Sequence, residues 1–397
     1  MTDLADKLHY LLALALSMLA VSGCALSRHE QIHAFGQVAG NTVSTRVDSP
    51  LAEYYIEEYS QGNRSNPQFN QQIDEIASLL DAGVPDNGTL EYITRKYKRD
   101  VATIALAEQL AADPVSAPFV GRYHNELALI TTGQVNPAEQ TPLIENMLVL
   151  FVPGWYWKDD SYDAEMKVPR QILARHGYQT ELLQTDEKGT VEANAEILAR
   201  RIRNCPDRPI MIVSVSKGGA ETALVLGELL SPAESRNVLA WVNINGAIRG
   251  ALLTNEYLSW NKKMFTRLSM RFLYHDSLAG MKSMRKDYRT QVYNSLHLPA
   301  NLKIVNLTAI PFSGQVNKRV CNSNRFLDKV GPNDGSLLIA DQLVENVPTV
   351  VELGFDHFFF DPLVGAKSLA AVRALEQVIA YDRAVAQDLP AALSQTR

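Results

Sequence analysis

The sequence lacks a bilayer-length apolar run at its N-terminus, an excess of positive charge, and more than a few cysteines. The apolar run over residues 11–21 is shorter than the roughly 20 residues that a membrane-spanning helix needs. The formal net charge is −6, which argues against a nucleic-acid-binding role that depends on phosphate contacts. Internal repeats and low-complexity segments are also missing. The 397 residues, 46% of them hydrophobic, therefore predict one large globular domain or two modest ones.

Residues 1–24 are typical of an export signal. The apolar run ends in Leu19-Ala20-Val21-Ser22-Gly23-Cys24, which resembles the lipobox of bacterial lipoproteins. The resemblance implies that residues 1–23 are removed and that the Cys24 thiol is diacylated. The protein would then be anchored in the bacterial cell envelope through Cys24, and Ala25 fits sorting to the outer membrane.

One observation leaves alternatives to the lipid anchor. The segment before the apolar run carries Asp3 and Asp6 against only Lys7, whereas an excess of positive charge is usual there. A cleaved signal peptide without a lipid and an uncleaved N-terminal helix are therefore the competing interpretations.

The two remaining cysteines, Cys205 and Cys321, are expected to be free thiols. Disulfide-bonded cysteines have Cα atoms within about 7 Å of each other. Cys205 precedes a predicted strand and Cys321 follows a later one, so a strand of roughly 25 Å, at ~3.3 Å per residue, separates them.

The chain divides into segments of different pattern. Residues 25–50 are polar and contain glycine, and we interpret them as a tether. Residues 51–140 have the apolar periodicity of helices, with no indication of their role. Residues 141–397 alternate strands with helices, which predicts a mostly parallel, doubly wound α/β sheet. The predicted strands lie at 147–152, 178–183, 210–215, 238–244, 302–310 and 349–353.

Ser216 is the most informative residue. The apolar run over residues 210–215 stops at Ser216, and a helix-forming stretch follows at once. Small residues, Ser214 and Gly218, stand two positions before and after it. This strand–turn–helix pattern is that of a nucleophile elbow, although glycine usually occupies both flanking positions.

Candidate partners of this serine follow in chain order. Asp334 lies in the turn sequence Gly-Pro-Asn-Asp-Gly, and His357 comes just after the last predicted strand. The order Ser216, Asp334, His357 is the one expected for the catalytic triad of an α/β-hydrolase. Residues 141–397 therefore resemble a serine esterase or lipase of the α/β-hydrolase superfamily. The resemblance implies that Ser216 is the nucleophile, His357 the general acid and base, and Asp334 the orienting carboxylate.

Each of these residues has a simpler interpretation. Asp334 fits ordinary turn chemistry. Asp356 is a rival for the acid, although a neighbour in sequence seldom reaches the same ring nitrogen. His357 could be a histidine buried under the aromatic residues that follow it.

Two further regions complete the predicted site. The oxyanion hole should use the backbone N–H groups of Lys217, the residue after the nucleophile, and of Trp155, in the loop after the first strand. The insertion at about 251–300 is predicted to be a helical cap. It is either a lid over an apolar acyl-binding cleft or an amphipathic helix packed on the core.

No metal site is predicted. His29-Glu30-Gln31-Ile32-His33 matches the H-E-x-x-H pattern, but such a site requires a helix in a cleft and a third ligand. The match lies in the predicted tether.

The sequence thus predicts a lipid-anchored serine hydrolase that cleaves small-molecule or lipid carboxylic esters through an acyl-enzyme, without metal or organic cofactor. A thioesterase, an amidase or an acyltransferase could use the same triad. The alternative from another class is an inactive hydrolase-fold lipoprotein that binds a ligand.

Overall fold

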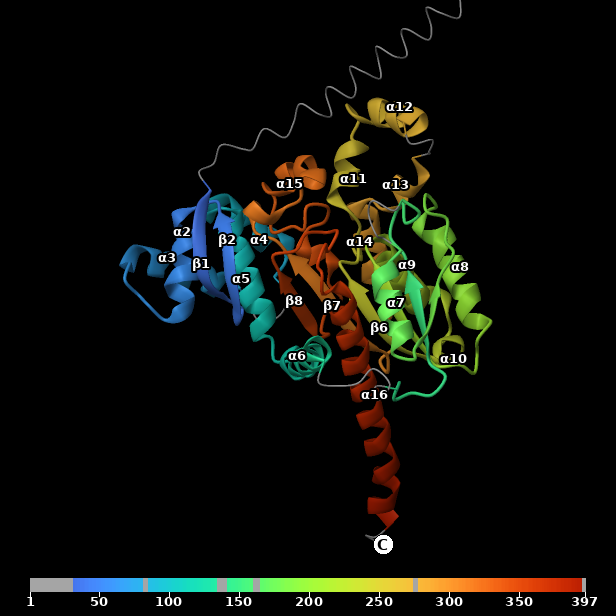
Figure 1. The fold of residues 1–397 in the computed structure, drawn as a ribbon. Helices are drawn as coiled ribbons and strands as arrows, with labels where there is room; N and C mark the ends of the chain where they lie inside the picture. Colours follow the sequence, from blue (N-terminus) through green and yellow to red (C-terminus); the bar gives the residue numbers. More distant parts are fainter. Residues whose placement is uncertain (1–30, 81–84, 134–140, 160–164, 274–277, 395–397) are drawn as a thin grey trace, which may run out of the picture.

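The computed structural model describes residues 31–80, 85–133, 141–159, 165–273 and 278–394 (Figure 1). The lipobox and Cys24 therefore lie outside the described residues. None of the helices in these ranges combines the length and the apolar character that crossing a bilayer requires.

A six-stranded sheet forms the centre of the structure. All its strand pairs are parallel, and the spatial order is β4-β3-β5-β6-β7-β8. This confirms the predicted α/β class. The strands are β3 (Leu148–Val152), β4 (Gln179–Leu182), β5 (Ile210–Val215), β6 (Val238–Ile244), β7 (Lys303–Ile310) and β8 (Thr349–Leu353).

Helices cover both faces of this sheet. One face packs against α8 and α9, the other against α6, α7 and α16. Because both faces are covered, central strands such as β3 are buried at every position and consist of consecutive apolar residues. The helices are α6 (Ala117–Thr132), α7 (Lys167–Arg175), α8 (Val191–Arg203), α9 (Lys217–Leu224), which continues as a π-helical turn (Val225–Leu229), the short α10 (Pro232–Ser235) and α16 (Val364–Ser394).

The prediction of a tether over residues 25–50 is wrong for its described part. β1 (Ile32–Val38) and β2 (Asn41–Val47) form an antiparallel hairpin that packs on α2. Positive φ angles at Ala39 and Gly40 make the two-residue turn. Buried small residues alternate with more exposed, mostly polar ones along both strands, so one face is buried although the segment is polar on average.

The predicted helical region, 51–140, contains five α-helices within its described residues. Together with the hairpin they form the N-terminal module, residues 31–132. It lies beside the β8 edge of the sheet, and α5 contacts β8 (Figure 1). Besides α6, its helices are α2 (Pro50–Glu57), α3 (Pro67–Leu79), α4 (Asn87–Tyr97) and α5 (Arg99–Ala112).

The insertion between β6 and β7 is helical, as predicted. Trp260 (96%) and Met264 (76%) are the most exposed apolar side chains among those of the insertion whose burial is described. Its helices are α11 (Leu252–Tyr257), α12 (Lys263–Leu273), α13 (Ala279–Ser283) and α14 (Lys286–Ser295).

The prediction of free thiols holds for one of the two cysteines. Cys205 is free. Cys321, the first residue of the short helix α15 (Cys321–Leu327), is disulfide-bonded, so the prediction is wrong there. The geometric argument compared Cys321 only with Cys205.

We predict that Gly36→Ala lowers the free energy of unfolding by about 1–3 kcal/mol or more, the usual order for overpacking. A Cβ at Gly36 would lie 2.2 Å from the Ile56 carbonyl oxygen, so the hairpin must separate from α2. Urea unfolding followed by circular dichroism measures the change.

Gly121→Ala is the matched control. Gly121 lies on the exposed face of α6, and nothing lies within 4 Å of the added methyl group. Alanine is favoured over glycine in a helix interior by about 1 kcal/mol, so this variant should be as stable as the wild type or more stable. Equal losses of stability in both variants would contradict the proposed packing of hairpin on α2.

Candidate active site

The turn at Ser216 joins β5 directly to α9. Ser216 has φ 53° and ψ −122°, a conformation that is costly for a residue with a side chain. Hydrogen bonds hold it: the Ser216 N–H donates to the Ile244 carbonyl (3.1 Å), and the Ala247 N–H donates to the Ser216 carbonyl (2.8 Å). The strand–turn–helix arrangement is the one that the sequence predicts.

The flanking small residues have distinct packing reasons. A Cβ on Gly218 would lie 2.5 Å from the Val152 carbonyl oxygen, so only glycine lets α9 approach β3 this closely. Ser214, where glycine is usual, is fully buried, and its Oγ accepts a hydrogen bond from Trp241 Nε1 at 2.7 Å. The serine hydroxyl thus has a partner, which makes this departure from the usual pattern compatible with the fold.

The structure brings together the three predicted triad side chains. His357, in the loop after β8, lies with its Nε2 3.0 Å from Ser216 Oγ and its Nδ1 2.6 Å from Asp334 Oδ2. The His357 N–H also donates to the Asp334 carbonyl at 2.8 Å. Both the backbone and the ring of His357 are therefore tied to Asp334.

Asp334 is completely buried, and its carboxylate has several donors. Its Oδ1 accepts from the N–H groups of Ser336 (2.8 Å) and Leu337 (2.7 Å), and its Oδ2 accepts from Gln342 Nε2 (2.9 Å) as well as facing His357. These donors fix which oxygen faces the ring. The sequence analysis missed Gln342, because a lone glutamine after a turn carries no recognisable signal.

The rival acid, Asp356, points elsewhere. Its two carboxylate oxygens accept from the N–H groups of Asn317 (2.7 Å) and Phe358 (3.1 Å). Burial raises the pKa of Asp356 above its ordinary value, although those two backbone donors oppose the shift.

Opposing effects act on the pKa of His357. Burial lowers it, but the charge of Asp334 and its hydrogen bond raise it more, and Asp356 adds to the rise. The pKa of His357 therefore lies above its ordinary value of 6.5. A base with a raised pKa accepts a proton from a hydroxyl more readily.

A cavity of about 320 Å³ opens at Ser216 and His357. The two residues predicted for the oxyanion hole, Lys217 and Trp155, both line it. Lys217 is the first residue of α9, where backbone N–H groups have no partner within the helix and the helix dipole favours negative charge. The Lys217 side chain is buried and pairs with Glu221 at 3.1 Å. The donor roles of the two backbone N–H groups stay predictions.

The H-E-x-x-H match does not form a metal site in the described part of the chain. His33 lies on strand β1, not on a helix, and its Nε2 is 3.3 Å from Ser44 Oγ. His29 lies outside the described residues. Within the described ranges no group of three or more histidine, cysteine or acidic side chains could hold a metal ion.

We predict that the His357 imidazole titrates above pH 6.5 and that Asp334→Asn moves its pKa below 6.5. Burial lowers the pKa of the ring, and the substitution removes the charge of Asp334, which mainly opposes this effect. The ¹³Cε1 chemical shift of labelled histidine against pH measures both values. An unchanged titration in Asp334→Asn would show that the contact between the two side chains does not form.

No protein-family model and no curated protein matches the sequence. Several solved structures do. A metagenomic carboxyl esterase is 22% identical with a TM-score of 0.47, over 62% of this chain and 78% of that one. The mature Bacillus licheniformis lipase BlEst2 is 16% identical with a TM-score of 0.43, over 56% and 88% of the two chains. The Legionella pneumophila phospholipase PlaB is 14% identical with a TM-score of 0.41, over 58% and 60%.

The chain's own geometry identifies the fold. A parallel sheet with helices on both faces carries Ser216 at a strained strand–helix turn, and Asp334 and His357 follow in chain order. The chain has the α/β-hydrolase fold.

Proposed function

We propose that this protein is a serine hydrolase that cleaves carboxylic esters through an acyl-enzyme intermediate. The observation that carries the proposal is the chain of hydrogen bonds from Ser216 Oγ to His357 (3.0 Å) and from His357 to Asp334 (2.6 Å), at the wall of a cavity. A serine hydroxyl becomes a useful nucleophile only beside an oriented base, and this arrangement supplies one.

The reaction runs in two halves. Ser216 Oγ attacks the ester carbonyl carbon while His357 Nε2 takes the hydroxyl proton, and the backbone N–H groups of Lys217 and Trp155 stabilise the oxyanion. The C–O bond to the alcohol then breaks, and His357 donates its proton to the leaving oxygen. Water repeats the sequence on the acyl-enzyme, releasing the acid and restoring Ser216.

The cavity favours an apolar acyl group. Its lining is dominated by aromatic and aliphatic side chains, including Trp155, Met281, Met284, Leu337 and Phe358. Asp, Glu and Arg do not occur among the described residues that line it. The one lysine among them, Lys217, is already paired with Glu221. An acyl chain without charge therefore buries favourable area there, whereas a charged acyl group would lose its hydration without gaining an unpaired partner.

We expect a fluorophosphonate to label Ser216 and His357→Ala to abolish the labelling, because the hydroxyl loses its base. Ser216→Ala should lower kcat for p-nitrophenyl butyrate by about 10⁶-fold and Asp334→Asn by about 10⁴-fold, as in other triads. In the wild type, kcat/KM should rise with pH through a pKa above 6.5, since the base must be neutral. Mass spectrometry of the adduct and steady-state kinetics measure these effects.

Asp356→Asn is the matched control, because the carboxylate of Asp356 accepts its hydrogen bonds from the backbone N–H groups of Asn317 and Phe358, whereas that of Asp334 faces the His357 ring. It should lose much less activity than Asp334→Asn. Full esterase turnover in Ser216→Ala would refute the proposal. Absence of both labelling and turnover in the folded wild type would favour the ligand-binding alternative, and a panel of thioesters and amides separates ester hydrolysis from the other reactions.

We also propose that Cys24 is diacylated and holds the enzyme on the bacterial envelope, which would present the cavity to substrates near a membrane. The support is the sequence Leu19–Cys24.

The mature protein should sediment with membranes, and Cys24→Ser should release it into the soluble fraction. The mass of the N-terminal peptide shows directly whether Cys24 carries the lipid. A mature chain whose Cys24 is not acylated would rule out the anchor.

A further inference from the structure

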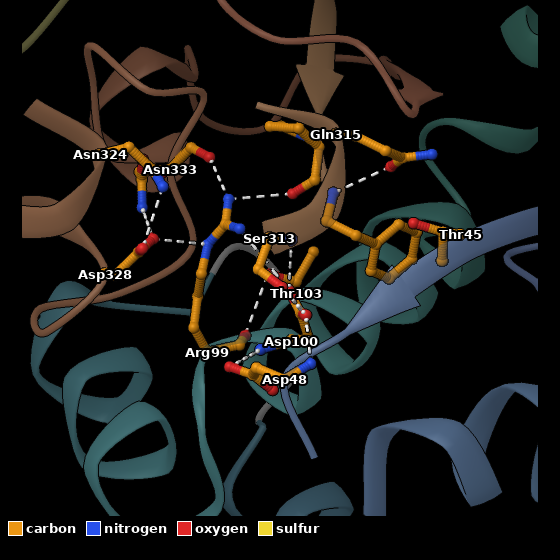
Figure 2. Close-up of polar contacts among 12 residues, drawn as sticks. Thr45, Asp48, Arg99, Asp100, Thr103, Ser313, Gln315, Asn324, Asp328 and Asn333 are labelled. Atoms are coloured by element: carbon orange, nitrogen blue, oxygen red, sulfur yellow. Dashed lines mark hydrogen bonds and ion pairs between the residues drawn. The ribbon is translucent and has the colours of Figure 1, made fainter. Parts of the chain in front are cut away.

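A buried arginine of the N-terminal module reaches the loop of the triad carboxylate. Arg99 begins α5 directly after Lys98, whose φ of 85° turns the chain sharply between α4 and α5. Arg99 is 3% exposed, and its Nη2 donates to two backbone carbonyls, that of Asn333 at 2.7 Å and that of Pro311 at 2.9 Å (Figure 2). Its Nε lies 3.1 Å from Asp328 Oδ1.

The carbonyl of Asn333 belongs to the peptide that joins Asn333 to Asp334. The N–H of that same peptide donates to the Leu337 carbonyl at 3.1 Å. Both polar groups of the peptide before the triad carboxylate are thus fixed, one of them by Arg99. A guanidinium can bridge two acceptors in fixed directions, which the compact ammonium of lysine cannot reproduce.

The neighbouring residue, Asp100, holds a second segment that borders the site. Its Oδ1 accepts from the Ser313 N–H at 2.9 Å, and its Oδ2 accepts from Ser313 Oγ at 2.5 Å and from the Asp48 N–H at 2.9 Å (Figure 2). The segment packs closely on the hairpin, since a Cβ on Gly314 would lie 2.8 Å from the Arg46 carbonyl oxygen.

This second segment leads to the triad histidine. A few residues after Ser313, the Asn317 N–H donates to Asp356 Oδ2, and Asp356 directly precedes His357. The N-terminal module therefore supports the acid loop through Arg99 and the histidine loop through Asp100. These contacts lie outside the cavity, because no described residue that lines the cavity belongs to residues 31–132.

We propose that Arg99 is a positioning residue for Asp334, through which the N-terminal module holds the acid loop. This inference rests on the proposed hydrolase function. Arg99 touches no substrate; it acts on the reaction by fixing the peptide that precedes the carboxylate. Because the module does not line the cavity, losing Arg99 should impair the chemical step and leave substrate binding nearly unchanged.

The test measures kcat and KM for p-nitrophenyl butyrate in Arg99→Ala and Arg99→Lys, per active site as counted by fluorophosphonate titration. We expect kcat to fall about 10- to 100-fold in Arg99→Ala, the scale of a displacement near 1 Å, with an intermediate fall in Arg99→Lys and KM within about threefold. The pKa on the acid side of the kcat/KM profile should also decrease, because a displaced Asp334 raises the pKa of His357 less.

Two controls separate positioning from stability. Arg95→Ala removes an exposed arginine of the same module whose ion pair is with Glu91 on its own helix, and kcat should not change. Gly36→Ala destabilises the module but keeps Arg99, so kcat per titrated site and the acid-side pKa should match the wild type.

A wild-type kcat and an unchanged acid-side pKa in folded Arg99→Lys and Arg99→Ala would overturn the inference. If Arg99→Ala does not fold, Arg99→Lys decides alone. A Gly36→Ala variant that lost kcat and shifted the pKa as Arg99→Ala does would also overturn it, since general loosening of the module would then explain both. A wild type that neither reacts with the fluorophosphonate nor turns over the ester would instead refute the hydrolase function itself.

Discussion

The left-handed backbone at Ser216 is the constraint on which the site depends. It projects the hydroxyl from the end of β5 and starts α9 in the same turn. Such a conformation persists only when its surroundings impose it. Here the neighbouring strand imposes it. The Ile244 carbonyl of β6 accepts a hydrogen bond from the Ser216 N–H, and the Ala247 N–H, in the loop after β6, donates to the Ser216 carbonyl. A Cβ on Gly219 would lie 2.7 Å from Gly246 Cα, so this loop and the helix could not approach as closely if Gly219 carried a side chain.

The other two triad residues come from loops with no regular structure of their own, and they need more support. The acid loop has backbone donors to the carboxylate, the side chain of Gln342, and the guanidinium of Arg99. The histidine loop is tied to the acid loop through both its backbone and its ring. Ser216 is thus fixed by the sheet, whereas Asp334 and His357 are fixed by each other and by the N-terminal module.

The sequence made the sheet and the triad predictable because their signals are local. The strand before Ser216 is a continuous apolar run, and Asp334 and His357 follow strands or turns in a known chain order. The strand β6 was predicted at the residues where it lies. The hairpin of residues 32–47 was not predicted, because a short alternation of small apolar residues inside a polar segment does not look buried. The role of Arg99 could not be predicted for a different reason. The Asn333 carbonyl that it binds is 234 residues away in the sequence, and nothing near Arg99 indicates that partner.

The distance along the chain between Arg99 and the acid loop has a consequence for when the protein becomes reactive. Arg99, which holds the acid loop, is synthesised early, whereas His357 is synthesised much later. Contacts of such long separation form late, because the chain between them must first be ordered. A nascent or partly folded chain would carry the serine on its elbow without an oriented base beside it. Under the proposed function, reactivity at Ser216 therefore requires that the contacts of Arg99 and His357 have both formed, and it reports that these two segments have come together.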